Sequence, residues 1–148
     1  MDATDPTFRL DHVGIQVREL GPAIRKFEEL FGYRQATEPV LNTRHNVEVV
    51  FLEKPGSLDI KLFRPAGDDI RRQPPKLHHL AFRSDDLDAD VARLEERGAR
   101  VLNPPAPGEA FDDEPIAFLF AGGINVELIS TDKRRGRRDQ GLALPESP

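Results

Sequence analysis

The feature of this 148-residue chain that most limits its possible folds is an internal repeat. Residues 11–20 match residues 78–87 in the order of their polar, apolar and acidic positions, at an offset of 67 residues, the separation of His12 from His79. The match continues at nearly the same offset from 51–52 onto 118–119 and from 59–62 onto 125–128. A period of this length indicates two copies of one supersecondary unit.

Each half contains the same predicted order of elements: a strand, a helix and then three strands. Alternating apolar and polar residues over 9–17 predict a strand, and apolar residues at helical spacing over 20–31 predict a helix that ends before Gly32. The apolar stripe that begins at Leu87 repeats this spacing and is also closed by a glycine, Gly98. The remaining strands are expected near residues 33–38, 46–53, 58–64, 99–103, 115–120 and 124–130.

The predicted fold class is therefore α+β, with two tandem βαβββ modules at about 9–64 and 77–130. A linker at 65–76, interrupted by Pro and Gly, joins the modules. Together they form a single domain over 9–131, in which a cup-shaped mixed sheet has its helices outside. Residues 132–148 contain little to bury and are expected to form a flexible tail.

Composition limits the function further. The chain has 21 Lys and Arg against 26 Asp and Glu, a net charge of −5, which argues against nucleic acid as a partner because phosphate binding favours a basic surface. No stretch approaches the roughly 20 apolar residues of a membrane span, and no signal peptide is visible, so we expect a cytoplasmic protein without a membrane partner. Since the chain has no cysteine, a metal would have to use His, carboxylate or amide ligands.

Alternation along the strands predicts which side chains face the inside of the cup. In the strand 9–17 it directs His12 to the cup and the apolar residues to the core. The same reasoning places His79, Lys61 and Glu127 on the cup face, at equivalent positions of the two modules. Two imidazoles and a carboxylate suit a divalent first-row metal. We therefore expect His12, His79 and Glu127 to lie close together as a metal site.

A candidate catalytic base lies outside this set. Alternation over 47–52 places Glu48 on the cup side, and a carboxylate among apolar neighbours has a raised pKa that suits proton abstraction next to a carbonyl. A position at the solvated rim of the cup is the alternative for Glu48. His78 is expected to be a strand-edge or core histidine without a part in the site.

These residues and their surroundings resemble the vicinal oxygen chelate superfamily, which includes glyoxalase I, methylmalonyl-CoA epimerase, extradiol dioxygenases and fosfomycin-resistance proteins. The resemblance covers residues 9–131. Its most similar segments are 10–15, 27–33, 77–82 and 124–128. Within the superfamily, residues 78–82 and 60–65 are most similar to methylmalonyl-CoA epimerase. The resemblance implies a homodimer that acts on a small molecule such as an acyl-CoA or a 2-oxo compound.

The resemblance also implies an activity: a metal-dependent isomerase or lyase that moves a proton next to a carbonyl. The metal ligands that the resemblance implies are His12, His79 and Glu127. Together with Glu48, which alternation places on the cup side, Lys61 and Glu127 are the candidate catalytic groups. Lys61 departs from the family pattern, in which Glu or Gln is the fourth ligand. A protonated ammonium has no lone pair to give to a metal.

This lysine leaves three alternatives open. In the first, a divalent metal such as Co, Ni, Mn or Zn is bound by the two histidines and Glu127, while Lys61 turns away or loses its proton and acts as a base. In the second, Lys61 replaces the metal by pairing with Glu127, and the protein either sequesters a small molecule or polarises a carbonyl. In the third, the site is degenerate and the lysine and glutamate form only a structural ion pair.

Overall fold

The computed structural model describes residues 8–67 and 74–138. In chain order the elements are β1 (Arg9–Gln16), α1 (Leu20–Phe31), β2 (Arg34–Gln35), β3 (Val40–Asn42), β4 (Val47–Glu53), β5 (Asp59–Pro65), β6 (Lys76–Arg83), α2 (Leu87–Glu96), β7 (Arg100–Gly108), the 3-10 helix η3 (Glu109–Phe111), β8 (Glu114–Ala121) and β9 (Ile124–Ile129). No helix in these two stretches is long and apolar enough to cross a membrane.

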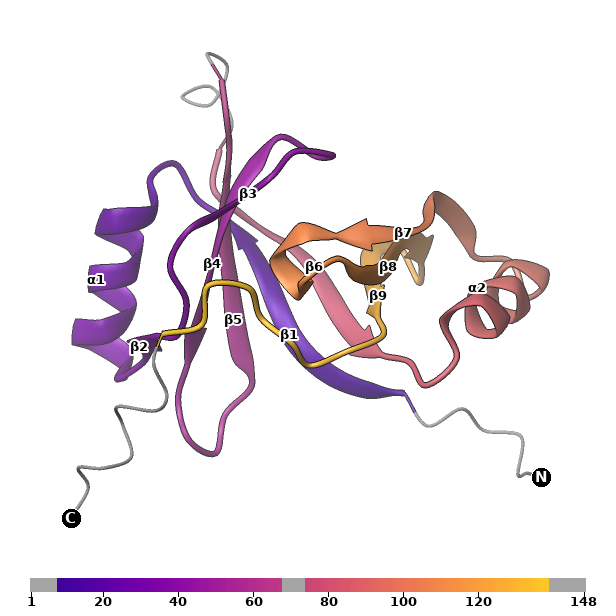
Figure 1. Cartoon of the computed structure of the whole chain (residues 1–148), viewed down its shortest axis with the longest axis horizontal. Coiled ribbons are helices and arrows are strands. Elements are labelled where there is room, and N and C mark those ends of the chain that lie inside the picture. Colours follow the sequence, from indigo (N-terminus) through magenta and orange to yellow (C-terminus); the bar gives the residue numbers. More distant parts are fainter. Residues whose placement is uncertain (1–7, 68–73, 139–148) are drawn as a thin grey trace.

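A mixed sheet runs through both halves of the chain. Over the described residues it has nine strands in the order β2-β4-β5-β1-β6-β9-β8-β7, with β3 paired to β4. The parallel pair of β1 and β5 has its counterpart in the parallel pair of β6 and β9, and antiparallel pairing of β1 with β6 joins the halves. In Figure 1 the sheet is strongly curved, with α1 and α2 on its outer sides. The α+β fold of two βαβββ modules is confirmed, with β3 as an additional short strand.

The helices form where their apolar spacing predicts them. Gly32 ends α1 with a φ of 75°, a left-handed conformation that glycine adopts without strain. At the start of α2, the Asp86 side chain accepts a hydrogen bond from the backbone N–H of Ala89 at 3.3 Å. Each helix covers an apolar cluster on the outer face of its module. The buried residues are Leu20, Ile24, Val50, Leu52 and Leu62 under α1, and Leu87, Val91, Ala117, Leu119 and Leu128 under α2.

Two segments differ from the predicted strands. The expected strand at 33–38 is reduced to the two residues of β2, and β3 follows it. The proline-rich segment at 103–108 extends β7, which pairs with β8 as far as Gly108. The register shift between Asn103 and Ala106 accommodates Pro104 and Pro105, which cannot donate a backbone hydrogen bond.

Residues 132–138 form a strap across the sheet, so the expected flexible tail is wrong for this part; residues 139–148 lie outside the described residues. Figure 1 shows the strap running from β9 across β1 and β5 to β2. The backbone N–H of Arg138 donates to Ala36 O at 2.8 Å, and that of Glu38 donates to Gly136 O at 2.8 Å.

The side chain of Arg134 holds the strap against the first module. Its side chain is buried, with Nη2 2.6 Å from Asp11 Oδ2 and 3.3 Å from Asp59 Oδ2. The guanidinium also lies 4.2 Å from the ring centroid of Phe51. The basic run that predicts a solvated tail therefore has carboxylate partners in the first module, which are distant in the sequence.

Candidate active site

The cup faces of β1, β5, β6 and β9 bring four predicted side chains to one point. Two imidazole nitrogens approach Glu127 Oε1, with His12 Nε2 at 3.1 Å and His79 Nε2 at 3.0 Å. Lys61 Nζ lies 3.2 Å from the same oxygen and 3.4 Å from Glu127 Oε2. All four residues are at most 5 % exposed. The expectation that they share one site is therefore met by their geometry.

Strand register explains this convergence. Lys61 lies opposite Gly14, two residues after His12, and Glu127 lies opposite the residue two after His79. The two halves thus supply equivalent pairs of side chains. Gly14 is required for a close approach, because a Cβ at this position would overlap the imidazole ring of His79.

The residue just before each site histidine has no partner on the neighbouring strand, because the register between β1 and β6 shifts at that point. These extra residues are Asp11 in β1 and His78 in β6. Asp11 Oδ2 lies 2.7 Å from His12 Nδ1, and His78 Nδ1 lies 2.8 Å from His79 Nδ1. Because these contacts hold the Nδ1 side of each ring, Nε2 is directed at Glu127.

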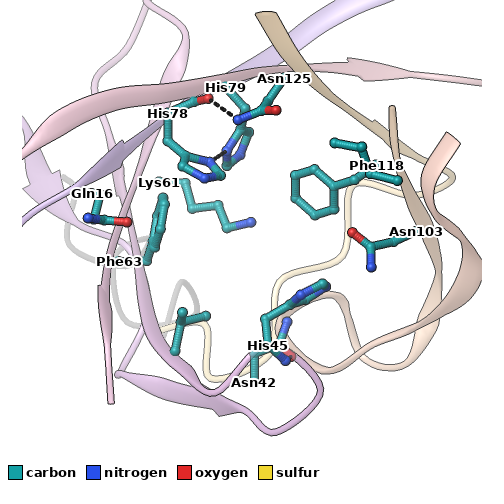
Figure 2. Close-up of a pocket in the computed structure, with 12 residues that line it drawn as sticks. Gln16, Asn42, His45, Lys61, Phe63, His78, His79, Asn103, Phe118 and Asn125 are labelled. Carbon is teal, nitrogen blue, oxygen red and sulfur yellow. Dashed lines mark hydrogen bonds between the residues drawn. The ribbon is translucent and has the colours of Figure 1, made fainter. Parts of the chain in front are cut away.

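His78 lines the cavity of the site, so its expected place at a strand edge or in the core is wrong. Its ring centroid is 5.0 Å from that of Phe63, and Figure 2 shows both rings at one side of the cavity. Simple alternation missed His78 because a bulge brings two consecutive side chains to the same face.

Glu48 does not face the cup, and the expectation that it does is wrong. Its carboxylate accepts a hydrogen bond from Arg64 Nε at 3.0 Å, and its side chain is 38 % exposed. Val49 packs inside the hollow, whereas Val50 packs under α1, so the phase of alternation is shifted by one residue. Residues 49–52 are all at most 1 % exposed, and a strand buried on both faces does not reveal its phase.

A cavity of about 320 Å³ opens beside this cluster, a volume that suits a small molecule. Lys61 and His79 line it, and Figure 2 shows Lys61 pointing into its middle. Four amide side chains also line the cavity and offer hydrogen bonds to a polar ligand: Gln16, Asn42, Asn103 and Asn125.

The ammonium of Lys61 lies among aromatic rings. Its Nζ is 5.9, 5.6 and 5.8 Å from the ring centroids of Phe63, Phe111 and Phe118. Ring faces at such distances favour a cation. Burial acts to raise the pKa of Glu127, but the charge of Lys61 and the close contacts with the two histidines outweigh it and hold this pKa well below its usual value. The two side chains therefore form a buried ion pair.

Burial lowers the pKa of His79 to about 4, with the charge of Lys61 acting in the same direction and the contact with Glu127 opposing it. The imidazole is therefore neutral at neutral pH. Its Nε2 is buried and makes no hydrogen bond within the described residues, although Glu127 Oε1 is 3.0 Å away. A neutral imidazole nitrogen without a hydrogen bond is a donor atom that a metal ion can use.

His12, His79 and Glu127 form a cluster of the kind that holds a divalent metal, with their donor atoms within 4.8 Å of one another. The two imidazole nitrogens lie 3.1 and 3.0 Å from Glu127 Oε1, close enough for the three residues to hold one ion together. The ammonium of Lys61 does not fit beside such an ion, because it has no lone pair and carries a like charge.

We expect the free energy of unfolding to fall by about 3 kcal/mol between pH 6.5 and pH 4, through His79. Since the folded pKa is below the ordinary value, the unfolded chain binds a proton that the native protein does not, and stability present above pH 6.5 is lost as the pH falls. Burial also lowers the pKa of His45 and of His78, which add to the loss. Urea unfolding across this range measures it. A His79→Asn variant with the wild-type pH dependence would contradict a buried neutral His79.

Residues 11–118 match the family model of the glyoxalase/bleomycin resistance protein/dioxygenase superfamily. The chain belongs to this superfamily. It is similar to the ethylmalonyl-CoA/methylmalonyl-CoA epimerase of Cereibacter sphaeroides, with 29% identity over 132 residues that cover 84% of this chain and 97% of the relative.

Solved structures of epimerases share the fold. Methylmalonyl-CoA epimerase from Mycobacterium tuberculosis is 31% identical, with a TM-score of 0.74 over 97% of this chain and 96% of that one. A methylmalonyl-CoA epimerase in complex with methylmalonyl-CoA and NH4+ has a TM-score of 0.72 at 24% identity, over 87% of this chain and 96% of its own.

Proposed function

We propose that the protein is an isomerase that moves a proton on the carbon next to the thioester carbonyl of an acyl-CoA, as in the epimerisation of a 2-substituted malonyl-CoA. The observation that carries this proposal is the convergence of His12, His79 and Lys61 on one buried oxygen of Glu127 beneath a cavity. Similarity to the epimerases of C. sphaeroides and M. tuberculosis over most of the chain supports this chemistry.

The reaction needs a positive charge at the carbonyl oxygen. Removal of the proton leaves an enolate, whose negative charge develops on that oxygen. The site can supply the charge in two forms. A divalent metal such as Co, Ni, Mn or Zn, held by His12, His79 and Glu127, would act as a Lewis acid on the carbonyl. The second form is metal-free and uses the ammonium of Lys61, and the ion pair of Lys61 with Glu127 favours it.

His45 is the proposed general base in place of Glu48. It lies in the turn between β3 and β4, where its backbone N–H donates to Asn42 Oδ1 at 3.1 Å. Its ring packs against Phe118, and Figure 2 shows it across the cavity from His78. Burial, aided by the charge of Lys61, lowers the pKa of His45, so the imidazole is neutral at neutral pH and able to accept a proton.

Solvent exchange tests the proposal. Incubation with methylmalonyl-CoA in heavy water is expected to place one deuterium on the carbon next to the thioester, at a rate proportional to protein concentration, as mass spectrometry would show. Glu48→Gln is the matched control and should exchange like the wild type, because Glu48 points away from the cavity. Calorimetric binding of methylmalonyl-CoA without exchange would contradict the isomerase and favour a protein that only sequesters a small molecule. The sequence also allows a lyase that acts on a 2-oxo compound. The same exchange assay, with a 2-oxo compound in place of methylmalonyl-CoA, tests this activity.

A further inference from the structure

We propose that Lys61 is the resident cation of this centre: its ammonium takes the place of the divalent metal, and the His12, His79 and Glu127 cluster binds a metal only when Lys61 is replaced. The catalytic half of this inference rests on the proposed function. The metal-binding half does not, and it can be tested without a substrate.

The ammonium of Lys61 already occupies the carboxylate of the cluster. Lys61 Nζ lies 3.2 and 3.4 Å from the two oxygens of Glu127, so it bridges the carboxylate that a metal would need. Its side chain comes from β5, at the position equivalent to that of Glu127 on β9. The lysine thus stands where the fourth ligand of a metal would stand, and supplies a charge instead of a lone pair.

Lys61 has no alternative carboxylate partner among the described residues around the cavity. Within the described residues, Lys61 forms its ion pair with Glu127. Its ammonium also faces the cavity, and the described residues that line the cavity include no carboxylate. The two nearby aspartates, Asp11 and Asp59, are both paired with Arg134. Withdrawal of Lys61 would therefore separate a buried pair and give the ammonium no new partner.

Charge balance at the centre also disfavours a divalent metal. The centre holds one carboxylate and one ammonium, so the pair is already neutral. A divalent ion bound to Glu127 would add two positive charges in a region at most 5 % exposed, next to an ammonium that repels it. Replacement of Lys61 by a neutral residue removes this repulsion and leaves Glu127 free for a metal.

The ammonium of Lys61 can also supply the positive charge that the reaction needs at the carbonyl oxygen. Lys61 lines the cavity, so one of its N–H groups can donate to the thioester carbonyl oxygen. In the proton-transfer step the C–H bond breaks, the proton passes to the imidazole of His45, and the electron pair moves to the carbonyl oxygen. Lys61 stabilises the enolate there without losing its own proton. A water molecule in the cavity then donates a proton to the opposite face of the carbon, which inverts it, and the hydroxide that remains takes the proton from His45.

Metal binding by the wild type and by Lys61→Gln tests the first half. After chelator treatment, each protein is dialysed against Co²⁺, Ni²⁺, Mn²⁺ or Zn²⁺, and bound metal is measured by elemental analysis. The wild type is expected to bind none tightly, whereas Lys61→Gln binds one ion per chain at least about 100-fold more tightly. Lys61→Met, which lacks the amide oxygen, should bind between these limits. Adding His79→Ala to Lys61→Gln should abolish the uptake.

One metal ion bound per wild-type chain, as tightly as in Lys61→Gln, would overturn the inference. The wild-type measurement decides this even if a variant fails to fold. Deuterium exchange with methylmalonyl-CoA in the presence of chelator then separates the two proposals. Full wild-type exchange without metal supports both. Exchange that needs added metal overturns the inference and keeps the proposed function, and absence of exchange with or without metal overturns the proposed function and the catalytic half.

Discussion

Replacement of Glu127 by Gln is expected to lower the free energy of unfolding by about 3–5 kcal/mol and to abolish proton exchange. The change leaves the ammonium of Lys61, which is 5 % exposed, without a negative partner. It also removes the carboxylate oxygen that the two site histidines approach. Urea unfolding at neutral pH, with deuterium exchange on the same samples, measures both effects.

Two variants control this prediction. Glu127→Leu combined with Lys61→Met removes both charges, so it should recover most of the lost stability but none of the activity. Glu48→Gln removes a carboxylate whose ion pair with Arg64 is partly exposed, and should change the free energy of unfolding by at most about 1 kcal/mol. A Glu127→Gln protein as stable as Glu48→Gln would contradict the buried ion pair.

Replacement of His45 by Gln is expected to reduce kcat for proton exchange by a factor of about 10²–10⁴, with little change in KM. Glutamine keeps hydrogen-bonding groups at a similar place but cannot accept a proton. The half-buried ring lies in a turn, so we expect the variant to fold like the wild type. Steady-state kinetics with methylmalonyl-CoA, alongside circular dichroism, measures this.

The pH profile distinguishes proton transfer by His45 from mere packing. The wild-type rate of proton exchange should rise as the pH increases through the lowered pKa of His45. The His45→Gln variant should not show this rise. The charged groups that act on this ring are Lys61, Glu127 and Arg44. Arg44→Gln removes a charge from the same turn, outside the cavity, and should retain the wild-type kcat. Retention of more than about a tenth of kcat by His45→Gln would contradict its role as base.

The repeat predicts the fold and the four central side chains of the site, because these side chains occupy strand positions that the two halves share. His12 and His79 occupy one such position, and Lys61 and Glu127 occupy another. In these strands one face packs under a helix, so alternation reveals the other face. Fold class and the approach of the four side chains could therefore be predicted without the structure.

What could not be predicted depends on local irregularity or on distant partners. The bulge that turns His78 into the cavity leaves no mark on the alternation of the strand. Burial of β4 on both faces concealed the outward direction of Glu48. Arg134 is 123 residues from its partner Asp11, so nothing local in the basic run predicts the strap. The homodimer and the cytoplasmic location stay predictions.

The most direct test of the central claim, that this centre isomerises an acyl-CoA, is to follow each enantiomer of methylmalonyl-CoA separately. The account predicts that the protein converts either one to the same equal mixture of both, and that Glu127→Gln does not. Tight binding of an enantiomer that keeps its configuration throughout would contradict the account.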